Sequence, residues 1–365
     1  MLLVVALGGN ALLERGESPD AQVQRRHVRA AALALAPLAA EHTLVLCHGN
    51  GPQIGMLAVE SENDPALTHP FPLDTLGAQT QGMIGYWLAQ ELGNAGLAGP
   101  AVTIVTRTEV GADDPAFHAP AKFVGQGYPE PVARRLALEH GWTVARDGRA
   151  WRRVVASPAP RRIIELPTIR QLVAAGTTVI CGGGGGVPVL AGDGGRYEGA
   201  QAVVDKDLTA ALLAVELGAD RLVVLTDVDA VRRDFGTPQE RPLSTADADE
   251  LRAMRFPAGS MAPKVEACIR FVTATGRPAA IGALRDAPAV LAGTAGTTIT
   301  HGGQPSTVTH GGQPSTVTDS GQPATHEGTA RHEGAGRHEG TARHEGAGRH
   351  EGVATHEGAA TTARR

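Results

Sequence analysis

The sequence predicts an α/β fold in which helices cover both faces of a mainly parallel central sheet. Two observations lead to this prediction. Short, almost wholly apolar runs recur along residues 1–299, and segments with a helical spacing of apolar residues separate them. Strands that read as continuous apolar runs are typical of parallel sheets buried on both faces, where ligands bind at the carboxyl ends of the strands.

Each element is predicted from its own pattern. Apolar runs bounded by glycine or polar residues predict strands at 2–7, 43–47, 101–105, 177–181, 221–225 and 279–281. Apolar residues three or four positions apart predict helices at about 20–40, 52–60, 74–96, 166–175, 206–217, 244–254, 261–275 and 286–291.

One stretch, about 112–160, interrupts this alternation. It is rich in proline, glycine and arginine, and it contains two short β-like runs at 142–145 and 151–156. We interpret it as an inserted lobe with a hairpin, which carries Lys122.

The composition changes near residue 300. From His301 onward the chain has no Leu, Ile, Met, Phe, Trp, Tyr, Cys or Lys, and a nonamer and a His-Glu-Gly hexad repeat instead. Such a segment cannot bury enough apolar surface to fold, so we expect 300–365 to be a disordered, low-complexity tail.

Composition also excludes several partners. The net charge is −5, the sequence pI is about 6.3 and aromatic residues make up 3%, so we expect no nucleic-acid or membrane surface. Three cysteines without a Cys-x-x-Cys pair predict neither a disulfide framework nor a cysteine zinc site. The apolar run 2–7 lacks the basic flank of a signal peptide. The uncharged stretch 172–192 holds five consecutive glycines, which a membrane-spanning helix would not tolerate. We therefore expect a cytoplasmic protein.

Lysine is rare in this chain. The 33 basic residues include only three lysines, Lys122, Lys206 and Lys264. A GC-rich coding bias accounts for most of this imbalance, but it leaves lysine mainly where a compact ammonium is needed and the planar guanidinium does not serve. We therefore expect at least two of the three to act on a small anion.

Three predicted strands run into glycine-rich turns. These turns contain Gly8 and Gly9, then Gly49 and Gly51, then 182–186. Backbone N–H groups approach an anion closely in such turns, although glycine also simply makes tight turns. Because G-x-x-x-x-G-K-[ST] and G-x-G-x-x-G are both absent, the turns indicate an oxyanion or phosphate site of another kind.

Polar side chains accompany these turns. The amides of Asn10 and Asn50 can donate to and accept from a small planar substrate, if they are not there only for turn geometry. His48 is more simply explained as a satisfied polar residue at a strand end than as a base. Thr226 and Asp227 follow another strand, where they suit a nucleotide, a Mg²⁺ hydration shell or only a turn.

Two lysines stand at predicted helix starts. Asp205 suits the N-cap of a helix that begins at Lys206 and Asp207. A lysine in a first turn opposes the helix dipole, so a carboxylate or a bound phosphate must offset it. Lys264 occupies a similar place, shortly after a plausible N-cap at Ser260.

The body of the chain, about 3–299, resembles the carbamate kinases of the amino acid kinase family. The motifs that carry the resemblance are VVALGGNAL at 4–12, HGNGPQIG at 48–55, QTQGMIGYWL at 79–88, DPAF at 114–117, WRRVVASPAP at 151–160, VVDKDLTAALLA at 203–214, LTDVDAV at 225–231 and GSMAPKVEA at 259–267. Around Lys122 the sequence PAKFVG departs from the usual PTKPIG, Ala262 stands where glycine is commoner, and Arg232 where tyrosine is frequent.

The resemblance implies a three-layer αβα sandwich with a protruding lid. In it, 1–299 would be one amino acid kinase domain, with an N-terminal carbamate-binding half, a lid at about 112–160 and a nucleotide-binding half at about 161–299. The implied reaction is Mg²⁺-dependent and reversible, ATP and carbamate giving ADP and carbamoyl phosphate. In arginine breakdown it often runs toward ATP, and the enzymes are usually homodimers.

The resemblance also implies roles for individual residues. The catalytic group would be Lys206, Asp207, Lys264 and Lys122. The carbamate and phosphoryl oxygens would be bound by Gly8, Gly9, Asn10, Gly49, Asn50 and Gly51. The nucleotide would be bound by Thr226, Asp227, Gly259, Ser260, Met261 and Lys264. No protein metal ligand is implied, because the nucleotide phosphates would hold Mg²⁺.

Two other functions remain open at this point. One is a kinase of the same family that acts on another small acid, against which the motifs at 48–55 and 79–88 argue. The other is a nucleotide sensor without catalysis, against which the retention of Lys206, Asp207 and Lys264 argues.

Overall fold

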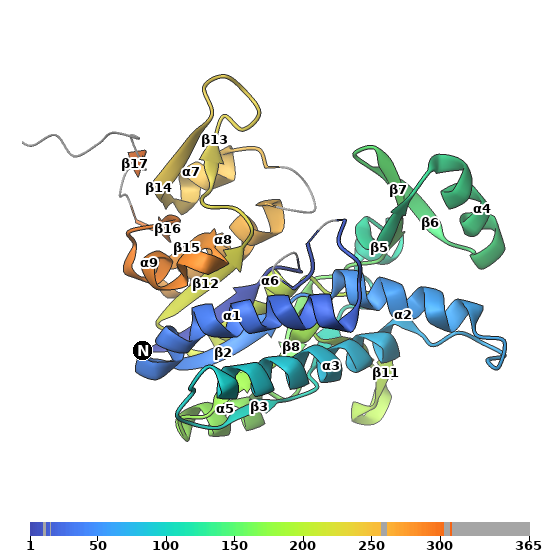
Figure 1. Ribbon diagram of the computed structural model, residues 1–365, viewed down its shortest axis with the longest axis horizontal. Helices are drawn as coiled ribbons and strands as arrows, with labels where there is room; N and C mark the ends of the chain where they lie inside the picture. The colour runs from blue at the N-terminus through green and yellow to red at the C-terminus, as the bar shows by residue number, and fades with distance from the viewer. Residues whose placement is uncertain (10–11, 15, 257–260, 303–306, 309–365) are drawn as a thin grey trace, which may run out of the picture. The chain divides into compact units, whose positions relative to one another are not determined.

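The computed structural model describes residues 1–9, 12–14, 16–256, 261–302 and 307–308. These residues belong to one compact unit, Met1–Gly311, shown in Figure 1. The remainder, including Asn10, Gly259, Ser260 and almost all of the expected tail, lies outside the described residues.

The centre of this unit is a ten-stranded sheet with the strand order β13-β14-β16-β15-β12-β1-β2-β9-β3 and with β17 beside β14. Its strands are β1 (Leu2–Leu7), β2 (Thr43–His48), β3 (Ala101–Thr103), β9 (Thr178–Ile180), β12 (Arg221–Thr226), β13 (Arg232–Arg233), β14 (Arg241–Asp247), β15 (Ala279–Ala283), β16 (Thr297–Thr300) and β17 (Thr307–Val308). The six strands from β15 to β3 are parallel, so their carboxyl ends share one edge.

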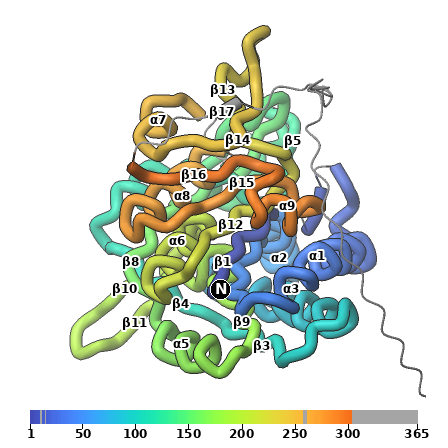
Figure 2. The backbone as a smooth tube through the Cα atoms, turned by 90° about the vertical axis from the view of Figure 1, so that its left-hand side faces the viewer, coloured from blue at the N-terminus to red at the C-terminus, as the bar shows by residue number. Residues whose placement is uncertain are grey.

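Helices cover both faces of this sheet, as the sequence predicts. One layer contains α1 (Ala21–Glu41), α3 (Leu73–Asn94) and α9 (Ala287–Ala292), and the other α5 (Leu166–Ala174), α6 (Lys206–Leu217) and α8 (Met261–Thr275). Figure 2 shows the two layers on either side of β1. Within β1, Leu3 and Val5 pack into the first layer, and Val4 and Ala6 into the second. This alternation gives the sheet two buried apolar faces.

Two smaller sheets extend this core. A four-stranded sheet has the order β11 (Tyr197–Gly199), β10 (Val187–Ala191), β4 (Arg107–Val110) and β8 (Pro160–Ile163). A three-stranded antiparallel sheet has the order β5 (Lys122–Tyr128), β7 (Ala150–Val155) and β6 (Thr143–Asp147), and carries α4 (Glu130–His140). These last four elements, which we call the lobe, lie beside α2 (Gly51–Asn63) in Figure 1.

Several boundaries differ from the sequence predictions. The helix predicted at about 244–254 is wrong in its first half, because β14 continues to Asp247 and only α7 (Ala248–Ala253) is helical. The polar run before Asp247 favours a helix start, but its backbone pairs with β16 and β17. The lobe contains the predicted hairpin as β6 and β7, and also β5 and α4, which were not predicted.

The boundary expected at residue 299 is slightly early. Thr307–Val308, inside the expected tail, forms β17 and pairs with β14. Among the described residues no helix combines the length and apolarity that crossing a membrane requires.

Candidate active site

The first part of the site is formed where β1, β2 and β12 end. Gly8 N donates a hydrogen bond to Leu225 O at 2.8 Å, and Gly49 N donates to Leu7 O at 3.0 Å. A Cβ atom at Gly49 would lie 2.7 Å from Gly9 N. The turns after β1 and β2 therefore pack backbone against backbone, and position 49 has room only for glycine.

The Asn50 side chain lies at the same edge, before the first residue of α2. It is 7% exposed, and its Nδ2 donates to Thr80 Oγ1 at 2.9 Å. Thr80 Oγ1 in turn donates to Gly77 O on α3. The glycine run packs against the same amide, because a Cβ at Gly184 (φ +63°) would lie 2.1 Å from Asn50 Nδ2. Sequence reasoning assigned no role to Thr80, which fixes this amide.

The second part of the site is a buried charge cluster at the start of α6. Lys206 Nζ donates to Asp207 Oδ1 at 2.5 Å, and Lys264 Nζ, from α8, donates to Asp207 Oδ2 at 3.1 Å. The side chains are 10%, 3% and 13% exposed for Lys206, Asp207 and Lys264. One carboxylate thus holds two ammonium groups, although α6 and α8 are far apart in the sequence.

Burial and charge oppose one another in this cluster. Burial would raise the pKa of Asp207, but the two ammonium charges outweigh it and hold that pKa well below its usual range. Burial lowers the pKa of Lys206, although the Asp207 charge opposes this. Burial would also lower the pKa of Lys264, but the Asp207 charge dominates and raises it.

Asp205 links the cluster to the lobe. Its Oδ1 caps α6 by accepting from Asp207 N at 2.9 Å and Leu208 N at 3.4 Å, as the sequence predicts. Its Oδ2 accepts a hydrogen bond from Lys122 Nζ, at the start of β5. All three lysines of the chain therefore meet at the N-terminus of α6. Asp205 was predicted as a cap, and its pairing with Lys122 was not foreseen.

Of the residues expected to bind the nucleotide, those that the structure describes lie near this cluster. Thr226 Oγ1 donates to Asp227 Oδ1 at 2.9 Å, and a Cβ at Gly8 would lie 3.2 Å from Thr226 Oγ1. Burial lowers the pKa of Lys264, and the Asp227 charge adds to the larger effect of Asp207 that raises it. Met261 begins α8. Ala262 is helical and has no positive φ, so it adds no backbone strain.

His48 is buried beneath the turns. It is 1% exposed, and its Nδ1 contacts Gly49 O at 3.0 Å. Burial lowers the pKa of His48 to about 4, so the ring is neutral at pH 7. This agrees with its interpretation as a satisfied polar residue. Within the described ranges, no three His, Cys, Asp or Glu side chains are grouped so as to hold a metal ion.

Comparison with known proteins identifies the class. The model of the amino acid kinase family matches residues 1–283. The chain therefore belongs to the amino acid kinase family.

Individual relatives narrow this class to the carbamate kinases. A carbamate kinase of Rhizobium meliloti is 51% identical over 304 residues, which are 82% of this chain and 93% of that protein. A Giardia lamblia carbamate kinase solved with citric acid is 38% identical with a TM-score of 0.78, over 82% of this chain and 98% of that one. The same Giardia enzyme solved with AMP-PNP gives 39% identity and a TM-score of 0.75 over the same shares. The fold class and the family expected from the sequence are confirmed.

Proposed function

We propose that this chain is a carbamate kinase that transfers a phosphoryl group reversibly between ATP and carbamate, giving ADP and carbamoyl phosphate. The observation that carries the proposal is the buried Asp207 carboxylate with Lys206 and Lys264 bound to its two oxygens. The relatives named above support the choice of carbamate as the acceptor.

Phosphoryl transfer needs alignment and charge neutralisation more than covalent chemistry. Lys206 and Lys264 supply two positive charges fixed in a largely dry site, where each is worth more than in water. Asp207 holds both ammonium groups in place and keeps them charged. Lys122 would add a third charge from the lobe, which would act as a lid over the reacting groups.

The acceptor side requires no general base. Carbamate is already an anion, so no proton has to be removed before it attacks the phosphoryl group. His48 would be a weak base, because burial lowers its pKa to about 4. The backbone of Gly8, Gly9, Gly49 and Gly51 would bind the carbamate and phosphoryl oxygens, with the amides of Asn10 and Asn50.

The donor side would be formed by the second half of the chain, about 161–299. Thr226, Asp227, Gly259, Ser260 and Met261 would line the nucleotide, and Lys264 would reach its transferred phosphate. Mg²⁺ would arrive with ATP or ADP, held mainly by the phosphates, where it neutralises their charge. In the cell we place the reaction in the cytoplasm, in a homodimer, running toward ATP in arginine breakdown.

The test is the formation of ATP from ADP and Mg²⁺ by the full chain, with carbamoyl phosphate or acetyl phosphate as donor. We expect rapid ATP formation with carbamoyl phosphate and at least 100-fold less with acetyl phosphate. A preference for acetyl phosphate would indicate another small-acid kinase. A folded protein that binds ADP but forms no ATP from either donor would indicate a nucleotide sensor.

A further inference from the structure

A buried carboxylate joins the lobe to the helix that starts at the candidate carbamate turn. This helix, α2, has Asn50 as its N-cap and carries Glu62 in its last turn. Glu62 Oε1 accepts hydrogen bonds from Trp142 Nε1 and from Arg153 Nη1, each at 3.0 Å. The Glu62 side chain is only 9% exposed. No step of the proposed reaction uses it.

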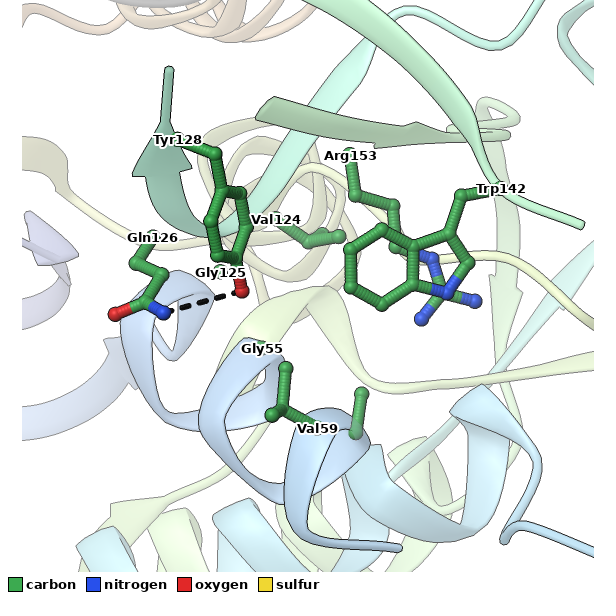
Figure 3. Close-up of a pocket in the computed structure, with 9 residues that line it drawn as sticks. Gly55, Val59, Val124, Gly125, Gln126, Tyr128, Trp142 and Arg153 are labelled. Atoms are coloured by element: carbon green, nitrogen blue, oxygen red, sulfur yellow. Dashed lines mark hydrogen bonds between the residues drawn. The ribbon is translucent and has the colours of Figure 1, made fainter. Parts of the chain in front are cut away.

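The groups around Glu62 are stacked as well as hydrogen-bonded. The guanidinium of Arg153 lies over the Trp142 ring, 5.0 Å from its centroid, and the His140 ring stacks with the same indole at 5.4 Å. Figure 3 shows the Arg153 guanidinium and the Trp142 indole against one another. A charge-assisted hydrogen bond is strong and directional in such a partly dry place, so Glu62 fixes the orientation of both partners.

A second contact between α2 and the lobe lies nearer the start of the helix. A Cβ atom at Gly55 would lie 1.9 Å from Gly125 Cα, so backbone meets backbone there. Apolar side chains of α2 and of the lobe pack beside it, namely Ile54, Ala58, Val124 and Val155. A small pocket of about 10 Å³ lies between α2 and the lobe, and Figure 3 shows residues that line it.

The face of the lobe that α2 holds is the face that carries Lys122. In the antiparallel pair of β5 and β7, Lys122 is opposite Val155 and Val124 is opposite Arg153. Opposite residues share a face of a sheet, as do residues two apart on one strand. The Arg153 that Glu62 binds is therefore on the same face as Lys122, which reaches Asp205 at the phosphoryl site.

We propose that Glu62 is a positioning residue for phosphoryl transfer: by binding Arg153 and Trp142 it fixes the lobe on α2 and so keeps Lys122 at the start of α6. This inference rests on the role proposed above for Lys122. It connects the carbamate turn and the lobe through a single helix.

The test is a double-mutant cycle on the full chain, measured as kcat and KM for ATP formation from ADP and carbamoyl phosphate. The variants are Glu62→Gln, Lys122→Ala and the two combined, with Glu60→Gln, an exposed carboxylate of the same helix, as the control. We expect Lys122→Ala to lower kcat about 100-fold. Displacing a reacting group by a fraction of an ångström is costly, so we expect Glu62→Gln to lower kcat about tenfold with the KM for ADP within about twofold.

The combined variant decides between positioning and simple stabilisation. If Glu62 acts through Lys122, Glu62→Gln changes kcat less than about twofold when Lys122 is already alanine. Hydrogen exchange of β5 should rise in Glu62→Gln and stay unchanged in Glu60→Gln. Trp142→Phe, which keeps a ring and removes the Nε1 donor, should lower kcat as Glu62→Gln does.

Each contrary result has a distinct meaning. A Glu62→Gln variant with normal kcat, or one with the same tenfold loss in both backgrounds, overturns the proposal and leaves the role of Lys122 intact. A Lys122→Ala variant with normal kcat removes the proposed role of Lys122 and this inference with it, while the carbamate kinase reaction stands.

Discussion

Replacing Asp207 by asparagine separates the charge of the buried cluster from its shape. In the protein one carboxylate accepts from Lys206 at 2.5 Å and from Lys264 at 3.1 Å. An amide of the same size keeps one acceptor but turns an N–H₂ group toward the other ammonium. The two lysines then lose the negative charge that lies between them.

The distances set the size of the effect. At an effective dielectric constant of about 20, opposite charges at these separations attract by about 5–7 kcal/mol for each pair. Desolvation of the charges offsets part of this, and removing one partner of a buried pair typically costs about 3–5 kcal/mol. We therefore expect Asp207→Asn to lower the free energy of unfolding by about 3 kcal/mol.

The kcat of Asp207→Asn should fall by an amount that depends on pH. Burial already lowers the pKa of Lys206, and without Asp207 nothing opposes it as strongly. The pKa of Lys206 then falls further, so we expect at least a 10³-fold loss of kcat that is partly recovered at lower pH.

The assays are urea unfolding and ATP formation between pH 5.5 and 8.5. Asp193→Asn, at an exposed position, is the control and should match the wild type in both. An Asp207→Asn protein that unfolds within about 1 kcal/mol of the wild type and keeps its activity and pH profile would refute the reasoning.

Gly49→Ala should raise the KM for carbamoyl phosphate at least tenfold, since its Cβ would lie 2.7 Å from Gly9 N. The control variant Gly82→Ala, which has open space around it, should leave this KM unchanged. Equal KM values for the two variants would contradict the packing of the turns. The folded-state pKa of Asp207 lies below its unfolded value, so the stability that its charge contributes is present above about pH 4 and is lost as the pH falls further. The difference in urea unfolding free energy between wild type and Asp207→Asn should therefore shrink below that pH. A difference that stays constant with pH would contradict this coupling of Asp207 protonation to stability. Removing 312–365 should leave kcat within about twofold, because every described site residue lies in Met1–Gly311; a tenfold loss would show that the tail contributes to activity.

Much of the fold could be predicted because its strands are buried. In β1 and β12 almost every residue is apolar, which is typical of a sheet covered on both faces. Among the strands that sequence reasoning missed, β4 and β14 contain more polar than apolar residues, so they do not stand out from loops. Their positions depend on pairing with distant strands.

The site shows the same division. The lysines at helix starts and the cap Asp205 could be predicted, because capping and dipole effects act within one turn. The partners Thr80 and Glu62 could not, because each meets its partner only after the chain has folded. Thr80 is 30 residues from Asn50, and Glu62 is 91 residues from Arg153.

The two lysines bound to Asp207, Lys206 and Lys264, are proposed to promote phosphoryl transfer through the compact geometry of their ammonium groups. The most direct test of this claim is the rate of ATP formation from ADP, Mg²⁺ and carbamoyl phosphate, with the wild type beside Lys206→Arg and Lys264→Arg. Both variants keep the positive charge but replace a compact ammonium by a planar fork, at positions where the lysine side chains are only 10% and 13% exposed. We predict an active wild type and a loss of about 10²-fold or more in each variant. Arginine variants with near-normal rates would contradict the claim.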